Sequence, residues 1–118
     1  MSGPSMYGLE KCSTCAKARN WLDRHRIDYR FVDYREHPVS PEQLGSWAEA
    51  VGGWEKLVNR TSMTWRNLPD ARKTPRSDPE WLLLIREYPA LVRRPLLAFA
   101  GGRVVQRFTE KQYSGLFL

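Results

Sequence analysis

The pattern of apolar and polar residues near the N-terminus changes from that of a strand to that of a helix around a pair of cysteines. A short apolar stretch at Met6 and Tyr7 ends at Gly8, which predicts one brief strand. From Ser13 onward, apolar or small residues recur at helical spacing, and the charged residues between them face away. This apolar stripe consists of Cys15, Ala18, Trp21, Leu22 and His25. The pattern therefore predicts a helix that begins at the cysteines.

The following segment, residues 27–34, alternates between the two faces of a strand. Ile27, Tyr29 and Phe31 fall on one face and the residues between them on the other, which is the period of two that a strand shows. A strand, a helix and a second strand joined by short connections predict a right-handed crossover with parallel strands. The functional end of such a unit lies where the first strand leads into the helix, and Cys12 lies at that point.

The middle of the chain carries the signals of several helices. Ser40 is placed as a cap, Pro41 suits a first turn, and Gln43 stands at the spacing of a capping box. This helix is predicted to run to about Val51 and to end at the two glycines that follow. A further turn or short helix is predicted at 54–58, irregular structure with short helical pieces at 60–77, and another helix at 79–88. The apolar stripe of that last helix consists of Trp81, Leu82, Ile85 and Tyr88.

The C-terminal part is predicted to form a hairpin followed by a helix. Two apolar runs, residues 96–100 and 104–108, flank a pair of glycines, which is typical of a hairpin with a two-residue turn. A second capping box at Thr109 and Gln112 predicts a last helix over residues 110–117.

The order of the predicted elements is strand-helix-strand, a helical block, and strand-strand-helix. This is the order of a thioredoxin-like fold, so we predict an α/β structure with a four-stranded mixed sheet and an inserted helical subdomain. At 118 residues the chain has the length of one domain that can bury its own core. We expect a single domain over residues 1–118, with the thioredoxin-like core at about 5–36 and 90–118 and the helical insert at about 37–89.

The formal net charge of +6 raises the question of nucleic-acid binding. Basic residues alternate with acidic ones along most of the chain, as at Asp23/Arg24 and Arg86/Glu87, and no run of five or more like charges occurs. We therefore expect a solvated basic surface or a localised anion site, and no direct nucleic-acid ligand.

The cysteine count and the N-terminus indicate a reducing compartment. Two cysteines are too few for a disulfide-rich secreted scaffold, and the stretch MSGPSM lacks the apolar core of a signal peptide. The longest apolar runs, residues 81–85 and 95–100, are shorter than the roughly 18 residues of a membrane-spanning helix. We expect a cytoplasmic monomer with no membrane segment.

Cys12 and Cys15 are placed for thiol chemistry. The start of a helix offers free N–H groups and partial positive charge, which favour the nucleophilic thiolate. Helical spacing puts Cys15 one turn deeper than Cys12, with Arg19 on the same stripe. We expect Cys12 to attack a disulfide, and Cys15 is placed to attack the mixed disulfide that results.

Two other interpretations of the cysteine pair are open. A zinc site needs two further ligands, and the remaining candidates, His25 and His37, stand at spacings unlike those of zinc fingers, so we expect no metal. Two inert, buried cysteines are the second alternative. The polar residues around the pair disfavour it; they are Lys11, Ser13, Thr14 and Lys17.

Three longer stretches carry a resemblance: MYGLEKCSTCAKARNWLDRHRIDYRFVDYR, GWEKLVNRTSMTWRNL and RRPLLAFAGGRVVQRF. In combination they resemble the ArsC/Spx/YffB family over about residues 6–117. The resemblance implies a thioredoxin-like fold with an inserted helical subdomain, in agreement with the order of elements. It also implies that Pro95 is a cis proline that faces the cysteine loop.

The resemblance also implies a nucleophile and an anion site, although the family holds three different functions. In members that reduce arsenate, a nucleophilic cysteine works with glutathione and three arginines bind the oxyanion. Cys12 matches that nucleophile. The arginine positions are matched by Arg60, Arg94 and Arg107, with Arg93 as a substitute for Arg94, and Lys11 and Pro95 complete the predicted anion site. Arginines bind an oxyanion, or a carboxylate of glutathione, through bidentate hydrogen bonds.

Gly8 and Ala16 depart from the arsenate-reducing members, whose motif has a His four residues before the cysteine and an Arg four residues after it. Spx-type members share the C-x-x-C as a redox switch and bind the RNA polymerase alpha subunit rather than DNA. Their chains continue past the final helix, whereas this sequence stops at Leu118. The insert GWEKLVNRTSMTWRNL looks most like the YffB group, thought to be glutathione-dependent thiol reductases, usually with one cysteine at this turn.

We therefore predict a glutathione-dependent thiol:disulfide oxidoreductase of the ArsC/YffB type, with Cys12 as nucleophile and Cys15 as a resolving thiol. Glutathione is the expected co-substrate, no cofactor is expected to stay bound, and the expected partner is glutathione or a protein thiol or disulfide. The alternative is an Spx-like redox-sensing regulator that binds the RNA polymerase alpha subunit. A further alternative is an arsenate reductase.

Overall fold

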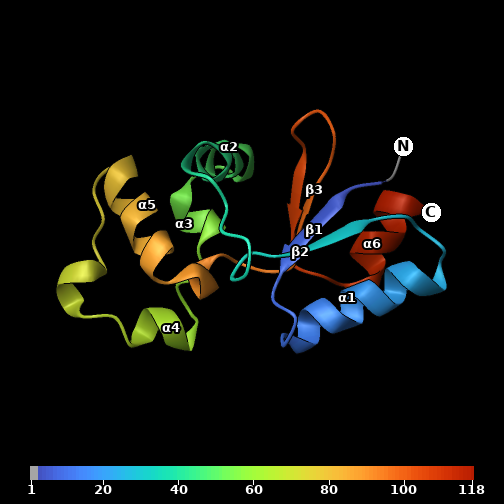
Figure 1. The fold of residues 1–118 in the computed structure, drawn as a ribbon, viewed down its shortest axis with the longest axis horizontal. Coiled ribbons are helices and arrows are strands. Elements are labelled where there is room, and N and C mark those ends of the chain that lie inside the picture. The colour runs from blue at the N-terminus through green and yellow to red at the C-terminus, as the bar shows by residue number, and fades with distance from the viewer. Residues whose placement is uncertain (1–2) are drawn as a thin grey trace. The chain divides into compact units, whose positions relative to one another are not determined.

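The computed structural model describes residues 3–118, which form two compact units. The sheet unit is built from the residues up to His37 together with Arg94–Leu118, and the helical unit is the continuous segment Pro38–Arg93 (Figure 1). Within the described part of the chain, no helix combines the length and the apolar character that crossing a membrane requires.

The sheet unit contains four strands in the order β2-β1-β3-β4. They are β1 (Ser5–Gly8), β2 (Arg30–Asp33), β3 (Leu96–Ala98) and β4 (Val104–Gln106). β1 runs parallel to β2 and antiparallel to β3, and β3 runs antiparallel to β4. This is the four-stranded mixed sheet of the predicted α/β, thioredoxin-like fold.

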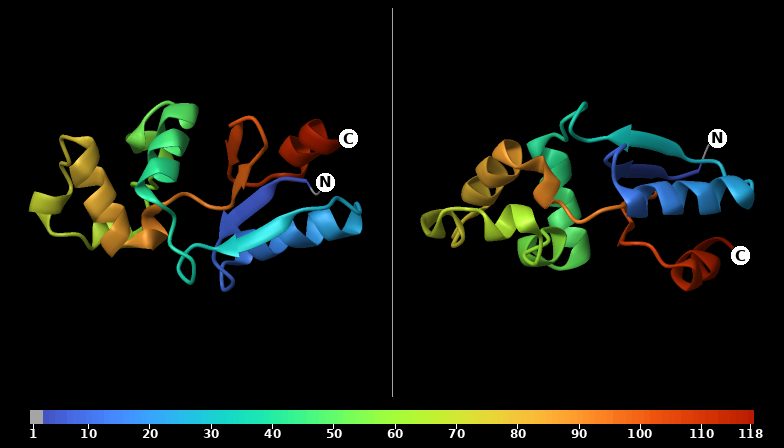
Figure 2. Two further views of the ribbon diagram at one scale, coloured as in Figure 1. Left: turned by 45° about the horizontal axis from the view of Figure 1, so that its top comes forward. Right: turned by 90° about the horizontal axis from the view of Figure 1, so that it is seen from below.

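Two helices, α1 (Ser13–Arg24) and α6 (Glu110–Phe117), pack on one side of the sheet (Figure 2). The core between helices and sheet consists of Met6, Ala18, Trp21, Leu22, Leu97 and Tyr113. The inward stripe of α1 follows the prediction from Cys15 to Leu22. His25 lies outside it, because this residue follows the end of the helix and its exposed ring stacks on Trp21 with 4.0 Å between centroids.

Strand β2 begins at Arg30, later than the predicted start at Ile27. The chain leaves α1 through Arg26 in a left-handed conformation with φ 56°, and the Ile27 N–H donates to Leu22 O at 3.0 Å. This turn ends α1, and the pairing of β2 with β1 therefore starts only at Arg30. The predicted alternation is still correct, because Ile27, Tyr29 and Phe31 all pack against the core.

The hairpin connection between β3 and β4 is longer than predicted. The Phe99 N–H donates to Arg103 O at 2.9 Å, so three residues, Ala100 to Gly102, form the turn instead of two. Gly101 and Gly102 have φ values of 93° and 95°, a conformation that glycine adopts without steric cost.

The helical unit contains four α-helices and two short 3-10 helices. They are α2 (Pro41–Val51), α3 (Trp54–Leu57), α4 (Met63–Arg66), η1 (Asp70–Arg72), α5 (Asp78–Glu87) and η2 (Pro89–Leu91). The Gln43 N–H donates to Ser40 Oγ at 3.2 Å, and Gly52 ends α2 with φ 99°. The cap and stop signals of α2 therefore act as predicted.

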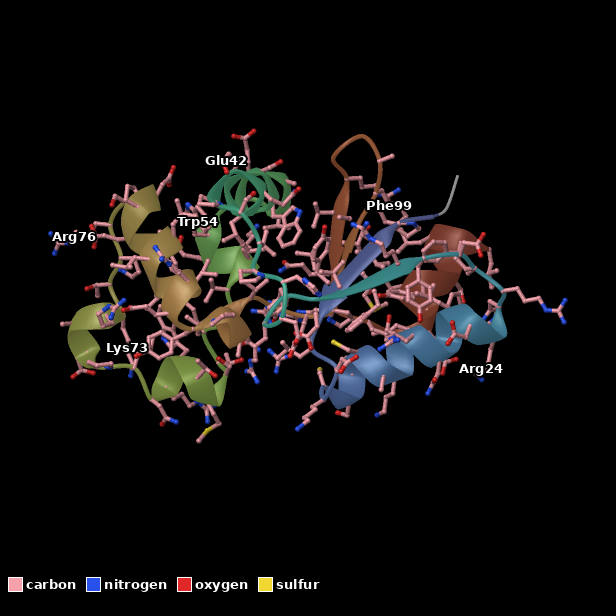
Figure 3. The ribbon with its side chains drawn as sticks, in the orientation of Figure 1. Arg24, Glu42, Trp54, Lys73, Arg76 and Phe99 are labelled. Atoms are coloured by element: carbon pink, nitrogen blue, oxygen red, sulfur yellow. The ribbon has the colours of Figure 1, made fainter. Side chains whose placement is uncertain are left out.

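Tryptophans hold the helical unit together. Trp81 stacks on Trp54 and on Trp65, with ring centroids 6.4 and 6.1 Å apart, and the indole N–H of Trp54 (labelled in Figure 3) donates to Asp78 Oδ1 at 2.8 Å. The predicted apolar stripe of α5 is partly wrong. Leu84 is buried and Leu82 only half-buried, because Leu84 shares with Trp81 the helix face turned to the core.

Candidate functional site

Cys12 is the N-cap residue of α1, at the point where β1 leads into the helix. Its N–H donates to Leu9 O at 3.1 Å, and its own carbonyl accepts the Ala16 N–H at 3.0 Å. The side chain is only partly buried, and both cysteines are free thiols. The fold thus presents the Cys12 sulfur at the first turn of α1, where unpaired backbone N–H groups favour a negative charge.

Asp33, at the end of β2, fixes the loop before Cys12. Its Oδ2 accepts the Glu10 N–H at 3.0 Å, and its Oδ1 accepts the Arg35 N–H at 2.8 Å. The Glu10 N–H is the main reason why the pKa of this carboxyl is lowered, and the Arg35 N–H adds to it. Asp33 could not be identified from the sequence, since only the parallel pairing of β1 and β2 brings it to the cysteine loop.

The surroundings of Cys12 favour its thiolate. Burial opposes ionisation, but the backbone N–H of Cys15, the guanidinium of Arg94 and the thiol of Cys15 all donate to the Cys12 sulfur, and together they lower its pKa. A lowered pKa increases the thiolate fraction near neutral pH, and the thiolate is the form of cysteine that acts as a nucleophile. Cys12 therefore has the chemistry of an activated thiol.

The surroundings of Cys15, in contrast, favour its neutral thiol. Only 1% of its surface is exposed, and burial, with a further contribution from the neighbouring Cys12 thiolate, raises its pKa to about 12 although the Leu9 N–H acts against this shift. A Cβ added to Gly8 would stand 2.5 Å from the Cys15 Sγ, so this sulfur packs directly against the backbone of β1. Cys15 is a neutral, buried thiol that donates a hydrogen bond to Cys12.

Tyr34 joins Arg94 beside Cys12. The Arg94 side chain is partly buried and hydrogen-bonds both the Cys12 sulfur and the Tyr34 hydroxyl. Tyr34 is 3% exposed, its N–H donates to Gly8 O at 3.1 Å, and burial raises its pKa to about 12. The neutral phenol thus accepts from the guanidinium and orients it. Tyr34 stands at the end of the predicted strand 27–34, but the sequence alone does not indicate its contact with Arg94.

Arg93 and Arg94, the two candidates for one position of the anion site, belong to different units of the structure. Arg94 contacts Cys12. The backbone of Arg93 belongs to the helical unit, where its N–H donates to Leu57 O at 2.9 Å. The next peptide bond, Arg94–Pro95, is cis, as the resemblance implied, and Pro95 is buried.

The other residues of the predicted anion site have different surroundings. Arg107 is exposed, has a φ of 70°, and its N–H donates to Pro95 O at 2.8 Å. Lys11 is exposed in the turn before Cys12. Arg60 lies in the helical unit, with a guanidinium nitrogen 3.8 Å from a Glu55 oxygen. Their part in anion binding stays a prediction.

Across residues 3–118 no group of three or more His, Cys, Asp and Glu side chains is arranged to hold a metal ion. His25, one of the two histidines considered for a zinc site, instead forms a 2.8 Å hydrogen bond between its Nδ1 and Trp21 O.

Comparisons with known proteins agree with the fold. A sequence model described as the ArsC family matches residues 7–116. An uncharacterized protein of Haemophilus influenzae is 35% identical over 113 residues, which are 96% of this chain and 97% of that protein. The global transcriptional regulator Spx of Enterococcus faecalis is 30% identical over 95 residues, 79% of this chain and 70% of the regulator.

Solved structures show the same similarity. A structure titled YFFB protein has a TM-score of 0.87 at 32% identity, covering 98% of this chain and 99% of that one. The solution structure of an arsenate reductase (ArsC) related protein from Brucella melitensis has a TM-score of 0.77 at 35% identity, covering 99% and 95%.

Proposed function

The chain belongs to the ArsC family, and we propose that it is a glutathione-dependent thiol:disulfide oxidoreductase with Cys12 as its nucleophile. The observation that carries the proposal is the contact of Arg94 with the Cys12 sulfur at the start of α1. Together with the backbone N–H of Cys15, this contact lowers the pKa of an accessible cysteine, and it leaves a cation beside it.

In the first step, the Cys12 thiolate attacks the glutathione sulfur of a glutathione-linked protein or small disulfide. A bond forms between Cys12 and that sulfur, the old disulfide bond breaks, and the released thiolate takes a proton from solvent. The Cys15 N–H and Arg94 hold the Cys12 thiolate before the attack. They therefore determine the direction from which the disulfide approaches the sulfur.

In the second step, the thiolate of another glutathione attacks the glutathione sulfur on Cys12. Glutathione disulfide leaves with the newly formed bond, and Cys12 returns to its thiolate. The other route, in which Cys15 attacks Cys12 and expels glutathione, first requires that the buried Cys15 lose its proton. Burial, the largest cause of the raised Cys15 pKa, persists in the adduct although the contribution of the Cys12 thiolate does not, so this route is slow near neutral pH. We therefore propose that Cys15 mainly supports the Cys12 thiolate and resolves the adduct only in alkaline solution.

The carboxylates of glutathione are proposed to bind Arg94, Arg107 and Lys11 of the sheet unit, around the cis proline Pro95. Guanidinium groups pair with carboxylates in a bidentate manner. The left-handed backbone of Arg107 supports this proposal, because non-glycine residues in that conformation concentrate at functional sites.

The proposal is tested by treating the protein with glutathione disulfide and locating the adduct by mass spectrometry. We expect one glutathione on Cys12, none in the Cys12→Ser variant, and turnover of a glutathione-linked substrate that depends on Cys12. An unmodified Cys12 together with no turnover would exclude the proposed activity.

A second candidate is a redox-sensing regulator like Spx. It is favoured by the similarity to the Enterococcus faecalis regulator and by the hydrogen bond between the two thiols, which makes them neighbours. Capture of the RNA polymerase alpha C-terminal domain, with oxidised and with reduced protein, decides this candidate. Absence of binding in both states removes it.

Arsenate reduction is the third candidate, and the geometry at Gly8 disfavours it. The histidine that arsenate-reducing members carry at this position has no room while Cys15 keeps its place. The test is arsenite formation from arsenate in the presence of glutathione and glutaredoxin. Arsenite formation in the wild type that is lost in Cys12→Ser would support arsenate reduction.

A further inference from the structure

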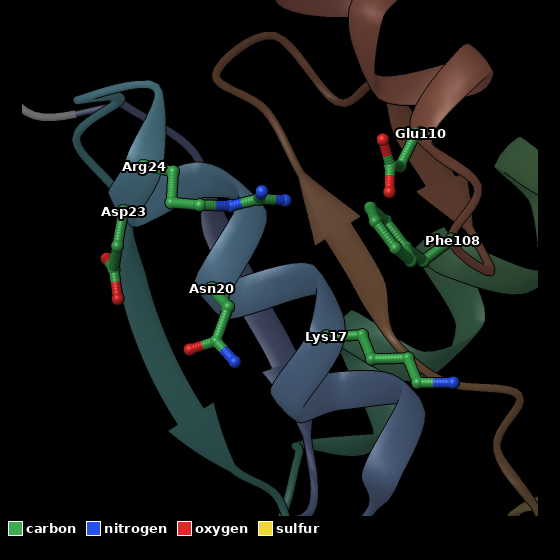
Figure 4. A pocket seen from close by; sticks show the side chains of 6 residues that line it. All are labelled: Lys17, Asn20, Asp23, Arg24, Phe108 and Glu110. Carbon is green, nitrogen blue, oxygen red and sulfur yellow. The ribbon is translucent and has the colours of Figure 1, made fainter.

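A groove of about 460 Å³ runs along the outer side of α1 in the sheet unit. One wall is α1 and the other is the connection from β4 to α6. Its lining residues are Lys17, Asn20, Asp23, Arg24, Phe108 and Glu110 (Figure 4). A groove of this size accommodates a few residues of a peptide rather than a whole protein surface.

Two cations of the groove face an aromatic ring. Figure 4 shows Lys17 and Arg24 extending from α1 toward the side of Phe108. The ring of Phe108 is held edge-to-face on buried Tyr113, with centroids 4.6 Å apart, and is itself only half-buried. It therefore presents a rigid apolar surface between two exposed positive charges.

Neither cation of the groove is engaged in an ion pair within the part of the chain that the structure describes. The ion pairs among residues 3–118 are Arg60–Glu55, Arg72–Glu87 and Lys73–Asp70, so Lys17 and Arg24 take part in none. Of the two carboxylates, Glu110 lies in the first turn of α6, where the helix dipole favours a negative charge. Figure 4 shows the other, Asp23, extending away from Phe108, whereas Lys17 and Arg24 extend toward its side. Lys17 and Arg24 are therefore available to a negatively charged ligand.

Both walls of the groove begin at the Cys12 site. Along α1, Lys17 follows Cys12 by about one and a half turns, roughly 7.5 Å of helix. On the other wall, Phe108 directly follows Arg107, whose N–H is bonded to Pro95 O. A chain that passes Cys12 thus continues into the groove, while a small disulfide held at Cys12 does not reach Arg24 at the far end of α1 (labelled in Figure 3).

We propose that the groove binds an acidic polypeptide segment of a protein substrate, with an apolar side chain of that segment on Phe108. Acidic side chains pair with Lys17 and Arg24, and the cysteine that carries the reactive disulfide lies a few residues away, at Cys12. This inference rests on the proposed thiol reductase function and names its substrate class as protein disulfides in acidic sequence surroundings.

The test uses two glutathione-linked peptides that differ only in the residues beside the cysteine, glutamate and leucine in one and lysine and leucine in the other. We expect the wild-type protein to have a kcat/KM about tenfold higher for the acidic peptide, since two exposed charge pairs each contribute a modest amount. The double variant Lys17→Glu/Arg24→Glu should reverse the preference. A general loss of folding or activity cannot produce such a reversal.

The matched control is Arg30→Glu/Arg103→Glu, which changes the net charge by the same amount at two exposed positions of the sheet unit outside the groove. It should keep the preference for the acidic peptide. Equal kcat/KM values for both peptides in the wild type, or the same reversal in the control, would overturn the groove as a binding site.

A binding measurement separates this inference from the proposed activity. Cys12→Ser protein is titrated with both peptides, their cysteine replaced by serine, and binding is followed by NMR shifts. We expect shifts at Lys17, Arg24 and Phe108 with the acidic peptide alone. If these shifts appear but the wild type shows no turnover, the groove binds the peptide and the proposed reductase activity is wrong. If turnover occurs without these shifts, the groove is not a binding site for the peptide.

Discussion

The sulfur of Cys15 occupies the space beside Gly8 that a side chain at position 8 would need, because a Cβ added to Gly8 would stand 2.5 Å from it. The glycine and the second cysteine therefore depend on each other. As long as Gly8 is present, Cys15 stays buried against β1 and its thiol points to Cys12, where it helps to lower the Cys12 pKa.

The first prediction concerns Gly8→Ala. The added methyl group forces Cys15 from its place, so the hydrogen bond from its thiol to Cys12 is lost and the Cys12 pKa rises. Overpacking of this kind costs about 1–3 kcal/mol of unfolding free energy. Denaturant unfolding and a titration of thiolate absorbance measure the two effects.

Gly115→Ala is the control for that substitution. Gly115 lies in α6 with no atom within 4 Å of an added Cβ, so alanine should raise the unfolding free energy by up to about 1 kcal/mol and leave the Cys12 pKa unchanged. If Gly8→Ala leaves both quantities as in the wild type, the dependence of Cys15 on Gly8 is wrong.

Tyr34→Phe removes the hydroxyl that orients Arg94. The guanidinium then spends less time at Cys12, and the Cys12 pKa rises. Loss of one hydrogen bond of about 0.5–1 kcal/mol predicts a roughly two- to fivefold slower alkylation of Cys12 by iodoacetamide below its pKa.

The matched control is Tyr29→Phe, which also removes a tyrosine hydroxyl bonded to an arginine, here Arg19 at 3.4 Å, but away from Cys12. Its alkylation rate should equal that of the wild type. Equal slowing in both variants would mean that Tyr34 has no special relation to the thiol.

Asp33→Asn tests the anchor of the cysteine loop through pH. The pKa of Asp33 is lower in the folded protein than the ordinary value of 3.8, so its charged form stabilises the fold above that value and the contribution disappears as the pH falls through the folded pKa. Thermal unfolding between about pH 6 and pH 3 should therefore fall less steeply in the variant than in the wild type. Asp28→Asn, at an exposed position, should keep the wild-type slope; a variant slope identical to wild type at Asp33 contradicts the anchor.

Cys15→Ser tests whether Cys15 resolves the glutathione adduct on Cys12. Because burial keeps the Cys15 pKa raised in the adduct as well, the Cys15 thiolate fraction is small at about pH 7 and grows roughly tenfold with each pH unit below that pKa. Mass spectrometry should find equally persistent adducts in wild type and variant near neutrality, with faster release in the wild type only in alkaline solution. Rapid release at neutral pH that needs Cys15 would instead establish it as the resolving thiol.

The sequence was sufficient for the order of elements because most of them are specified locally. The capping residues Ser40 and Thr109 and the stop at Gly52 act within one helical turn, and the structure contains each of them where expected. The errors are at places where a backbone detail decides. The left-handed Arg26 delays β2, and the Phe99–Arg103 hydrogen bond lengthens the hairpin turn.

The residues of the candidate site also fall into those that the sequence identified and those that it did not. Cys12 could be found from its place between a strand and a helix, whereas Arg94 was identified by resemblance alone, with Arg93 equally plausible from its position. Asp33 and Tyr34 escaped notice because each acts on a residue far away in the sequence, Glu10 and Arg94. Only the folded sheet unit brings these pairs together.

The pKa of the Cys12 thiol tests the central claim most directly. It is obtained from the pH dependence of thiolate absorbance in the wild type, with Cys12→Ser as the blank, and again in Arg94→Gln. We predict a wild-type pKa below the ordinary cysteine value of about 8.5 and a higher one once the guanidinium is gone, because Arg94 donates to this sulfur. A wild-type pKa at or above about 8.5, unchanged in Arg94→Gln, would contradict an activated nucleophile at Cys12.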